Sequence, residues 1–171
     1  NQTVCATTST MAATTTGVCT GTWSLISGAG LITTPTATNS GITALGFGIN
    51  VFQWEVGNGV CATSTSTMSI QRDIPPSVSV AGPNQTVCVG TNPIMAANAA
   101  TVGLGTWTKI SGSGAITSPN NPATTITGLT AGTTVLQWSI ATAPCAPSPS
   151  QLHITPNEPP TVANAGPNPN V

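Results

Sequence analysis

Side chains that could carry acid–base or metal chemistry are scarce in this sequence. Its charged and imidazole groups are Glu55, Asp73, Glu158, Arg72, Lys109 and His153. A serine-type triad needs a base with an acid beside it, and the single histidine has no acid at a useful spacing. Calcium needs several converging oxygen ligands, which two acids near the expected domain junctions do not supply. We therefore expect no enzyme, no metal site and no cofactor.

Cysteine is the reactive residue type that recurs regularly. Cys5 and Cys61 lie 56 residues apart, and Cys88 and Cys145 lie 57 apart. The simplest pairing is Cys5–Cys61 and Cys88–Cys145, with each disulfide adding roughly 4 kcal/mol in the loop-entropy model. Disulfides indicate an oxidising compartment. Zinc is the weaker alternative, because the sequence has no Cys-x-x-Cys pair.

The sequence contains two copies of one repeat. "NQTVC" stands at 1–5 and again at 84–88, and "GTW" stands at 21–23 and 105–107. Other matching phrases keep the same spacing of 84 residues, and the offset of 83 for "NQTVC" implies one insertion between Cys88 and Met95. Self-similarity at a fixed period predicts tandem domains. Because the last residues, "AGPNPNV", return to the opening phase, we expect a segment of a longer array.

Cys19 lies outside this regular set, because its counterpart in the second copy is Gly103. Free cysteine packs as a small hydrophobic residue, so an unpaired buried thiol is the simplest interpretation. Pairing with another molecule and disulfide exchange with Cys5 are the alternatives.

The composition indicates an extracellular all-β protein. Only 3% of the 171 residues are charged and the mean hydropathy is +0.22, so the chain is not a hydrophilic disordered one. Its abundant Thr and Val favour strands. The net charge of −1 leaves no basic patch for nucleic acid. No apolar run is long enough for a membrane-spanning helix.

The second copy shows the expected elements most clearly. Strands are expected at 75–88, 93–99, 105–111, 115–117, 123–129, 133–142 and 150–155. In the longest of them Leu136, Trp138 and Ile140 share one face. About seven short strands per copy predict two tandem Ig-like β-sandwiches, with one disulfide each. The tryptophan pairs Trp23–Trp54 and Trp107–Trp138 are expected to pack in the two cores.

The pattern "AGPNQTVC…GTWT…TTITGL…VLQW…C" resembles the PKD-like, Ig-type repeats of large secreted surface proteins of Bacteroidota. Those proteins include gliding adhesins and other type IX secretion substrates. The resemblance covers both copies. It implies an extracellular, non-catalytic repeat, since such modules serve as spacers in many proteins.

These features predict a first repeat at 1–74, whose leading strand is missing or supplied by a neighbour. They also predict a second repeat at 75–158, and at 159–171 the leading strand of a third repeat or a donor strand. The junctions carry Pro75–Pro76 and Pro159–Pro160, and proline restricts a linker. The leading hypothesis is a structural unit of a surface fibre or adhesin stalk. It would assemble with neighbouring repeats, either in one covalent array or by strand donation between identical subunits. The alternative is a carbohydrate- or ligand-binding accessory module.

Overall fold

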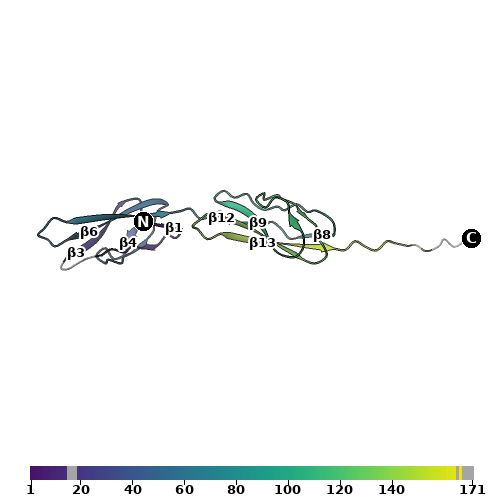
Figure 1. The fold of residues 1–171 in the computed structure, drawn as a ribbon, viewed down its shortest axis with the longest axis horizontal. Helices are drawn as coiled ribbons and strands as arrows, with labels where there is room; N and C mark the ends of the chain where they lie inside the picture. The colour runs from purple at the N-terminus through teal and green to yellow at the C-terminus, as the bar shows by residue number, and fades with distance from the viewer. Residues whose placement is uncertain (15–18, 165, 167–171) are drawn as a thin grey trace, which may run out of the picture. The chain divides into compact units, whose positions relative to one another are not determined.

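The computed structural model describes residues 1–14, 19–164 and 166 (Figure 1). Its contacts divide the chain into two units. The first unit contains Asn1–Pro75 together with Thr142–Ala146, and the second contains Pro76–Ala141 together with Pro147–Val171. Residues 142–146 are therefore grouped with the first unit by their contacts, although they lie between two sequence segments of the second unit.

The first unit is a sandwich of two sheets. Its larger sheet has the order β1-β7-β6-β3, formed by Gln2–Val4, Ser64–Arg72, Gly48–Gly57 and Thr20–Ser27. β1 is parallel to β7, and the other neighbours are antiparallel. The smaller sheet has the order β2-β5-β4, formed by Ser9–Thr10, Gly41–Thr43 and Leu31–Ile32. The core consists of Met11, Trp23, Ile42, Leu45, Phe52, Trp54 and Ile70.

The second unit repeats this plan. Its larger sheet has the order β8-β13-β12-β9, formed by Gln85–Cys88, Ser148–Asn157, Thr134–Ala141 and Leu104–Ser111. β8 is parallel to β13, as β1 is to β7. The smaller sheet pairs β10 (Ala115–Ile116) with β11 (Ile126–Thr127), and a single bridge joins Ile94 to Thr125 beside it. The all-β, Ig-like sandwich expected from the sequence is confirmed.

Alternation of apolar and polar residues explains the larger sheet of the second unit. Leu136, Trp138 and Ile140 of β12 are almost completely buried, while the residues between them are partly exposed. On β13, Leu152 and Ile154 are buried and His153 is exposed. A strand with one face on a core and one in water needs this period of two.

The "GTW" phrase has a steric cause. Trp107 pairs with Trp138 across β9 and β12, with ring centroids 5.3 Å apart, and Trp23 pairs with Trp54 at 5.1 Å. A Cβ atom at Gly105 would collide with the indole of Trp138. Glycine two residues before the first tryptophan therefore leaves room for the second ring.

Three expected strands are shorter than the sequence indicates, because β11 covers only Ile126–Thr127 of the strand expected at 123–129. Of 75–88 only β8 is a strand, and of 93–99 only Ile94 makes a ladder bridge. Residues 77–82 bond instead to side chains, including the hydroxyls of Ser148 and Ser150. Such side-chain bonds satisfy the backbone without a ladder, which periodicity alone does not reveal.

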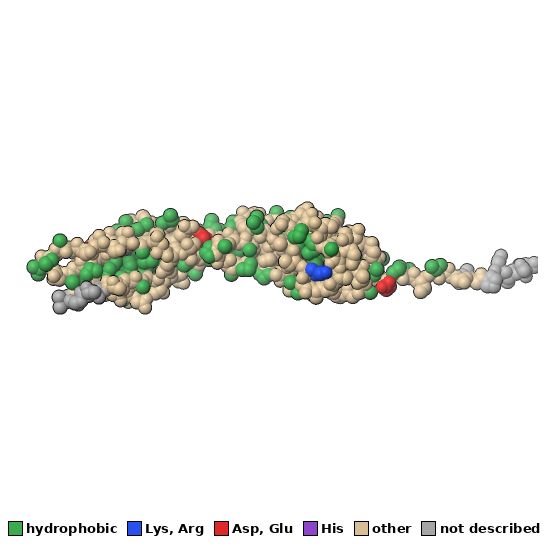
Figure 2. Space-filling view, in the orientation of Figure 1, with side chains coloured by type: hydrophobic (Ala, Val, Ile, Leu, Met, Phe, Trp, Pro, Cys, Tyr) green, Lys and Arg blue, Asp and Glu red, His purple; other side chains and the backbone are tan. Residues whose placement is uncertain are grey.

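The surface is almost free of charge, as the wide uncharged areas in Figure 2 show. Within the residues that the structure describes, no helix is long and apolar enough to cross a membrane.

Candidate assembly site

The repeated "NQTVC" phrase fastens the first strand of each unit. The side-chain oxygen of Asn84 accepts a hydrogen bond from the backbone N–H of His153 at 2.9 Å. Its counterpart, the Asn1 side chain, accepts from Ser69 N–H at 3.1 Å. These bonds hold the start of β8 and β1 against β13 and β7. The asparagine of the phrase therefore has the same structural role in both units.

The glutamine that follows ties the two sheets together. Gln85 donates its amide to the carbonyl of Ile94 at 2.9 Å, and Gln2 donates to the carbonyl of Thr10 at the same distance. Val87 and Val4 pack against the two cores. The last residue of the phrase is the cysteine, Cys88 or Cys5.

In the second unit, the segment that precedes "NQTVC" lies along the sandwich. We call Ser77–Gly82 the leading segment. Val80 donates its N–H to the side chain of Asn98 at 2.8 Å and accepts from Asn98 N–H at 3.0 Å. Ser79 N–H and Ala81 N–H donate to the hydroxyls of Ser148 and Ser150 at 3.0 and 3.1 Å. The leading segment is thereby hydrogen-bonded to Asn98 and to the serines of β13.

The leading segment also completes the core. Ala81 is 1% exposed and belongs to the buried cluster with Trp138 and Leu152. Gly82 has φ of +89°, and a Cβ atom there would stand 2.8 Å from the carbonyl oxygen of Ala96. Only glycine combines that backbone conformation with such a close approach. The segment is therefore an integral part of the second sandwich.

Among the residues that the structure describes, the first unit has a groove where the second has its leading segment. The groove has a volume of about 370 Å³. Its lining includes Ala12, Thr14, Trp54, Ser64, Ser66 and Met68. The counterparts 84 residues later are Ala96, Asn98, Trp138, Ser148, Ser150 and Leu152. Four of those counterparts bond to or touch the leading segment directly, and the other two share the core with Ala81.

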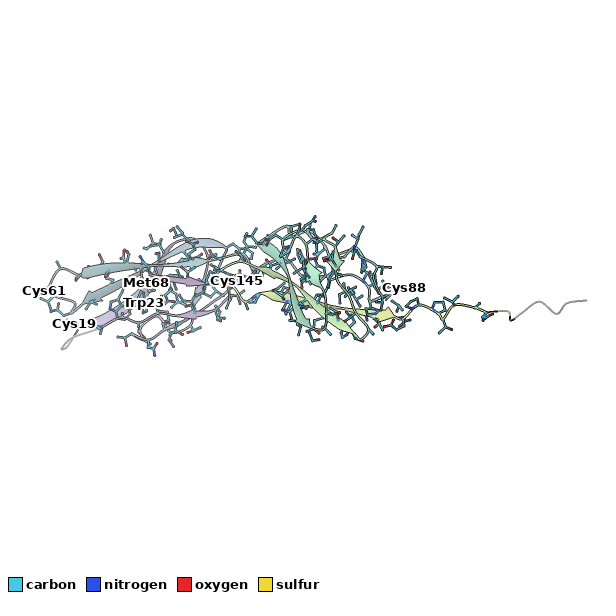
Figure 3. The ribbon with its side chains drawn as sticks, turned by 45° about the vertical axis from the view of Figure 1, so that its right-hand side comes forward. Cys19, Trp23, Cys61, Met68, Cys88 and Cys145 are labelled. Carbon is cyan, nitrogen blue, oxygen red and sulfur yellow. A yellow bond between two sulfur atoms is a disulfide. The ribbon has the colours of Figure 1, made fainter. Side chains whose placement is uncertain are left out.

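Burial differs between the two units at these positions. Leu152 and Ile140 are completely buried, while their counterparts Met68 and Val56 are partly exposed (Figure 3 labels Met68). The hydroxyl residues Ser64 and Ser66 are exposed, while Ser148 and Ser150 are not. The groove is thus an apolar floor with hydrogen-bonding serines at its rim.

The disulfide pattern corrects the sequence expectation. The structure bonds Cys5 to Cys145, with Cα atoms 5.4 Å apart, and contains neither of the two expected pairs. The direction of the first strand explains why the expected pairs do not form. Because β1 runs parallel to β7, Cys5 lies near Arg72 at the end of β7, whereas Cys61 precedes its start at Ser64. Nine strand residues span about 30 Å, far beyond the reach of a disulfide.

The remaining cysteines are free thiols in the structure. Cys61 and Cys88 are exposed and Cys19 is partly buried. Cys19 and Cys61 line one cavity beside the β6–β7 loop, at the end of the first unit that Figure 3 shows far from Cys145. The expected pairings of Cys61 and Cys88 are therefore wrong, and the Cys19 thiol is partly buried.

The residues that could do chemistry are not brought together. Glu55 and His153 are both exposed, on strands of different units. Arg72 donates to the carbonyl of Leu45 at 2.8 Å and lies over the ring of Phe47, 4.0 Å from its centroid. Lys109 donates to the carbonyl of Gly114. Among the described residues, no three His, Cys, Asp or Glu side chains are grouped as metal ligands.

The fold and the groove define the chain as a tandem pair of Ig-like β-sandwiches. No family model matches it. A search of curated proteins also finds no match. Among solved structures, the insect immune protein hemolin, whose structure was described for its implications for homophilic adhesion, aligns with a TM-score of 0.52 and 12% identity. That alignment covers 92% of this chain and 44% of hemolin, so this chain spans less than half of that protein.

Two further structures are similar at lower scores. The PKD domain of the KIAA 1837 protein aligns with a TM-score of 0.41 and 19% identity, covering 54% of this chain and 92% of that one. The tandem Ig repeats of Dlar align with a TM-score of 0.39 and 9% identity, covering 92% and 93% of the two chains. At such identities, the likeness to hemolin concerns the fold.

Proposed function

We propose that this chain is a non-catalytic structural repeat of an extracellular fibre or adhesin stalk, of the kind that Bacteroidota secrete to their surface. One observation carries the proposal. The first unit has an open groove lined by the counterparts of the residues that hold Ser77–Gly82 in the second unit. A sandwich with such a groove accepts a leading segment of the same type from the repeat before it.

The chain also contains a further copy of the leading segment. Residues 161–166 read "TVANAG" where 77–82 read "SVSVAG". Gly166 has φ of +75°, in the same left-handed region as Gly82 at +89°. Val162 is 95% exposed. Within the expected segment 159–171, residues 165 and 167–171 lie outside the described part of the chain.

The groove and this segment give the repeat two complementary sites. A contact between two different surfaces of identical units builds an open filament when the rotation between neighbours does not close a ring. The uncharged surface supports close packing of such filaments, since no like charges oppose it (Figure 2). The neighbouring unit is either the next repeat of one long chain or a second copy of this chain.

The alternative role as a carbohydrate-binding module has less support. Sugar-binding sandwiches commonly present exposed aromatic rings, but all four tryptophans here are at most 5% exposed. The exposed Phe47 is covered on one face by Arg72. A glycan array tests this role directly, and specific binding to a glycan would favour it.

Electron microscopy of the native material tests the proposal. We expect fibres with a regular axial repeat on or released from the cell surface, decorated by antibodies against this chain. A native particle that is a compact monomer or dimer would contradict the structural role. Heating the fibres in denaturant with reductant and measuring the covalent mass separates the two forms of assembly. Non-covalent subunits dissociate to 16.9 kDa, whereas one long array does not.

A further inference from the structure

We infer that Cys88 and Cys61 are the two halves of a disulfide that joins successive copies of this repeat. Cys88 bonds to the loop cysteine of the following copy, and Cys61 bonds to the "NQTVC" cysteine of the preceding copy. This inference rests on the proposed function, and it specifies how neighbouring repeats are fastened.

The bond present in the structure supplies the template. Cys5 ends the "NQTVC" phrase of the first copy, and Cys145 lies in the β12–β13 loop of the second copy. The disulfide therefore links one copy to the copy that follows it in sequence. Loop residues 142–146 group with the first unit, so the bond lies among contacts of that unit.

Cys88 is the counterpart of Cys5. Cys88 is the last residue of β8 and Cys5 directly follows β1. Each of these strands runs parallel to the last strand of its unit, β8 beside β13 and β1 beside β7. The registers agree, because Gln85 opposes Ile154 as Gln2 opposes Ile70. Cys88 thus occupies in the second unit the position that Cys5 occupies in the first. Its thiol is exposed.

Cys61 is the counterpart of Cys145. Each lies in the loop that joins the last two strands of its unit, β6–β7 and β12–β13. Each closes a four-residue turn, because Cys145 N–H donates to the carbonyl of Thr142 at 2.8 Å and Cys61 N–H donates to the side chain of Asn58 at 2.9 Å. Asn58 and Thr142 are themselves counterparts, 84 residues apart. The Cys61 thiol is exposed, so a cysteine of another copy can reach it, as Cys5 reaches Cys145.

The chemistry balances with an ordinary oxidant. The thiol of Cys88 and the loop thiol of the next copy lose two protons and two electrons as one S–S bond forms. A disulfide oxidant such as oxidised glutathione accepts them and leaves as two thiols. The step proceeds by attack of one thiolate on the oxidant and displacement by the second thiolate.

Complementary variants of the full chain provide the test. Cys61→Ser keeps only the Cys88 half and Cys88→Ser keeps only the Cys61 half, and both also carry Cys19→Ser. In a glutathione redox buffer, each variant alone should stay at the monomer mass of 16.9 kDa on a non-reducing gel. Their mixture should form a species of twice that mass, which reductant removes. Mass spectrometry should find the Cys88 peptide joined to the Cys61 peptide.

A longer chain distinguishes the source of the partner. A copy of residues 85–168 is joined after Asn168, so that a third repeat follows in the same polypeptide. If the partner is the next repeat in one chain, Cys88 should bond within the monomer to the added cysteine that corresponds to Cys145. If it is a separate subunit, linked oligomers should dominate instead.

Three results would overturn the inference. One is a Cys61–Cys19 bond in the oxidised wild-type chain, since these residues line one cavity. Another is a Cys88–Cys88 dimer of Cys61→Ser alone, formed as readily as the mixed dimer. The third is a mixture that stays monomeric. Fibres that assemble without the Cys88–Cys61 bond would refute this inference and leave the structural role intact.

Discussion

Cys5 is bonded to Cys145, a residue of the other copy of the repeat, and not to Cys61 of its own copy. The parallel strand β1 places Cys5 at the far end of β7 from Cys61, so a bond inside one copy is out of reach. The disulfide therefore reinforces the connection between copies.

Removal of this bond should loosen the first strand. In Cys145→Ser, β1 loses its covalent anchor and keeps its non-covalent contacts, and we expect the chain to lose about 2–4 kcal/mol of stability. Hydrogen exchange should become faster in β1 and unchanged in its counterpart β8. Cys19→Ser serves as the control, because that thiol is free. Equal protection of β1 in both variants would argue against a structural role for the bond.

A charge in the leading segment should disrupt the second unit. Ala81 is 1% exposed, so Ala81→Asp buries a carboxylate without a partner, and we expect a loss of about 3 kcal/mol or more. Val78 in the same segment is 75% exposed, and Val78→Asp should change stability by less than about 0.5 kcal/mol. Urea unfolding of both variants makes the comparison. Equal effects would show that the segment is not part of the core.

The glycine of "GTW" should be irreplaceable. Gly105→Ala places a methyl group against the indole of Trp138, and overpacking should cost about 1–3 kcal/mol. Gly132 has φ of +104° with nothing within 4 Å of an added Cβ, so Gly132→Ala should show only backbone strain, about 1–2 kcal/mol. Gly105→Ala should also shift the near-ultraviolet signal of the paired tryptophans, and Gly132→Ala should not. An unchanged tryptophan signal in Gly105→Ala would contradict the proposed collision.

A buried amide should hold the first unit together. Asn50 is 1% exposed, accepts from Ala29 N–H at 2.8 Å and donates to carbonyls including that of Ile70. Asn50→Ala leaves these backbone groups unsatisfied, and we expect a loss of about 2–4 kcal/mol by thermal unfolding. Asn58→Ala, at an exposed turn, is the matched control and should cost less than about 1 kcal/mol. A loss in Asn50→Ala no larger than the control's would remove Asn50 from the determinants of the fold.

Periodicity was sufficient to predict the sandwich and its strongest strands. The alternation of Leu136, Trp138 and Ile140, and the repeated tryptophans, specify which face is buried. Periodicity did not predict the direction of the three-residue strand β1, because so short a strand carries no signal of parallel or antiparallel pairing. The wrong disulfides followed from that missing direction.

The sequence predicted a first repeat whose leading strand is missing or supplied by a neighbour, but it did not predict the hydrogen-bonding groups that line the groove. The sequence indicates that "SVSVAG" precedes the second "NQTVC", and hence that a leading segment exists. It does not indicate that Ser148 and Ser150 accept its backbone hydrogen bonds, since serine on an exposed strand face is unremarkable. In the proposed function, the comparison of Ser64 and Ser66 with these residues is what makes the groove a candidate site for the leading segment of a neighbouring repeat.

The most direct test of the account is to supply that segment. Residues 75–83 are placed before Asn1 of the full chain, and a control extension carries aspartate at the position of Ala81. We expect the first extension to slow hydrogen exchange at β7 and raise the unfolding temperature of the first unit by about 4–8 °C, or about 1 kcal/mol. The control should do neither. If both extensions leave the first unit unchanged, the groove does not receive a leading segment, and the proposed mode of assembly is wrong.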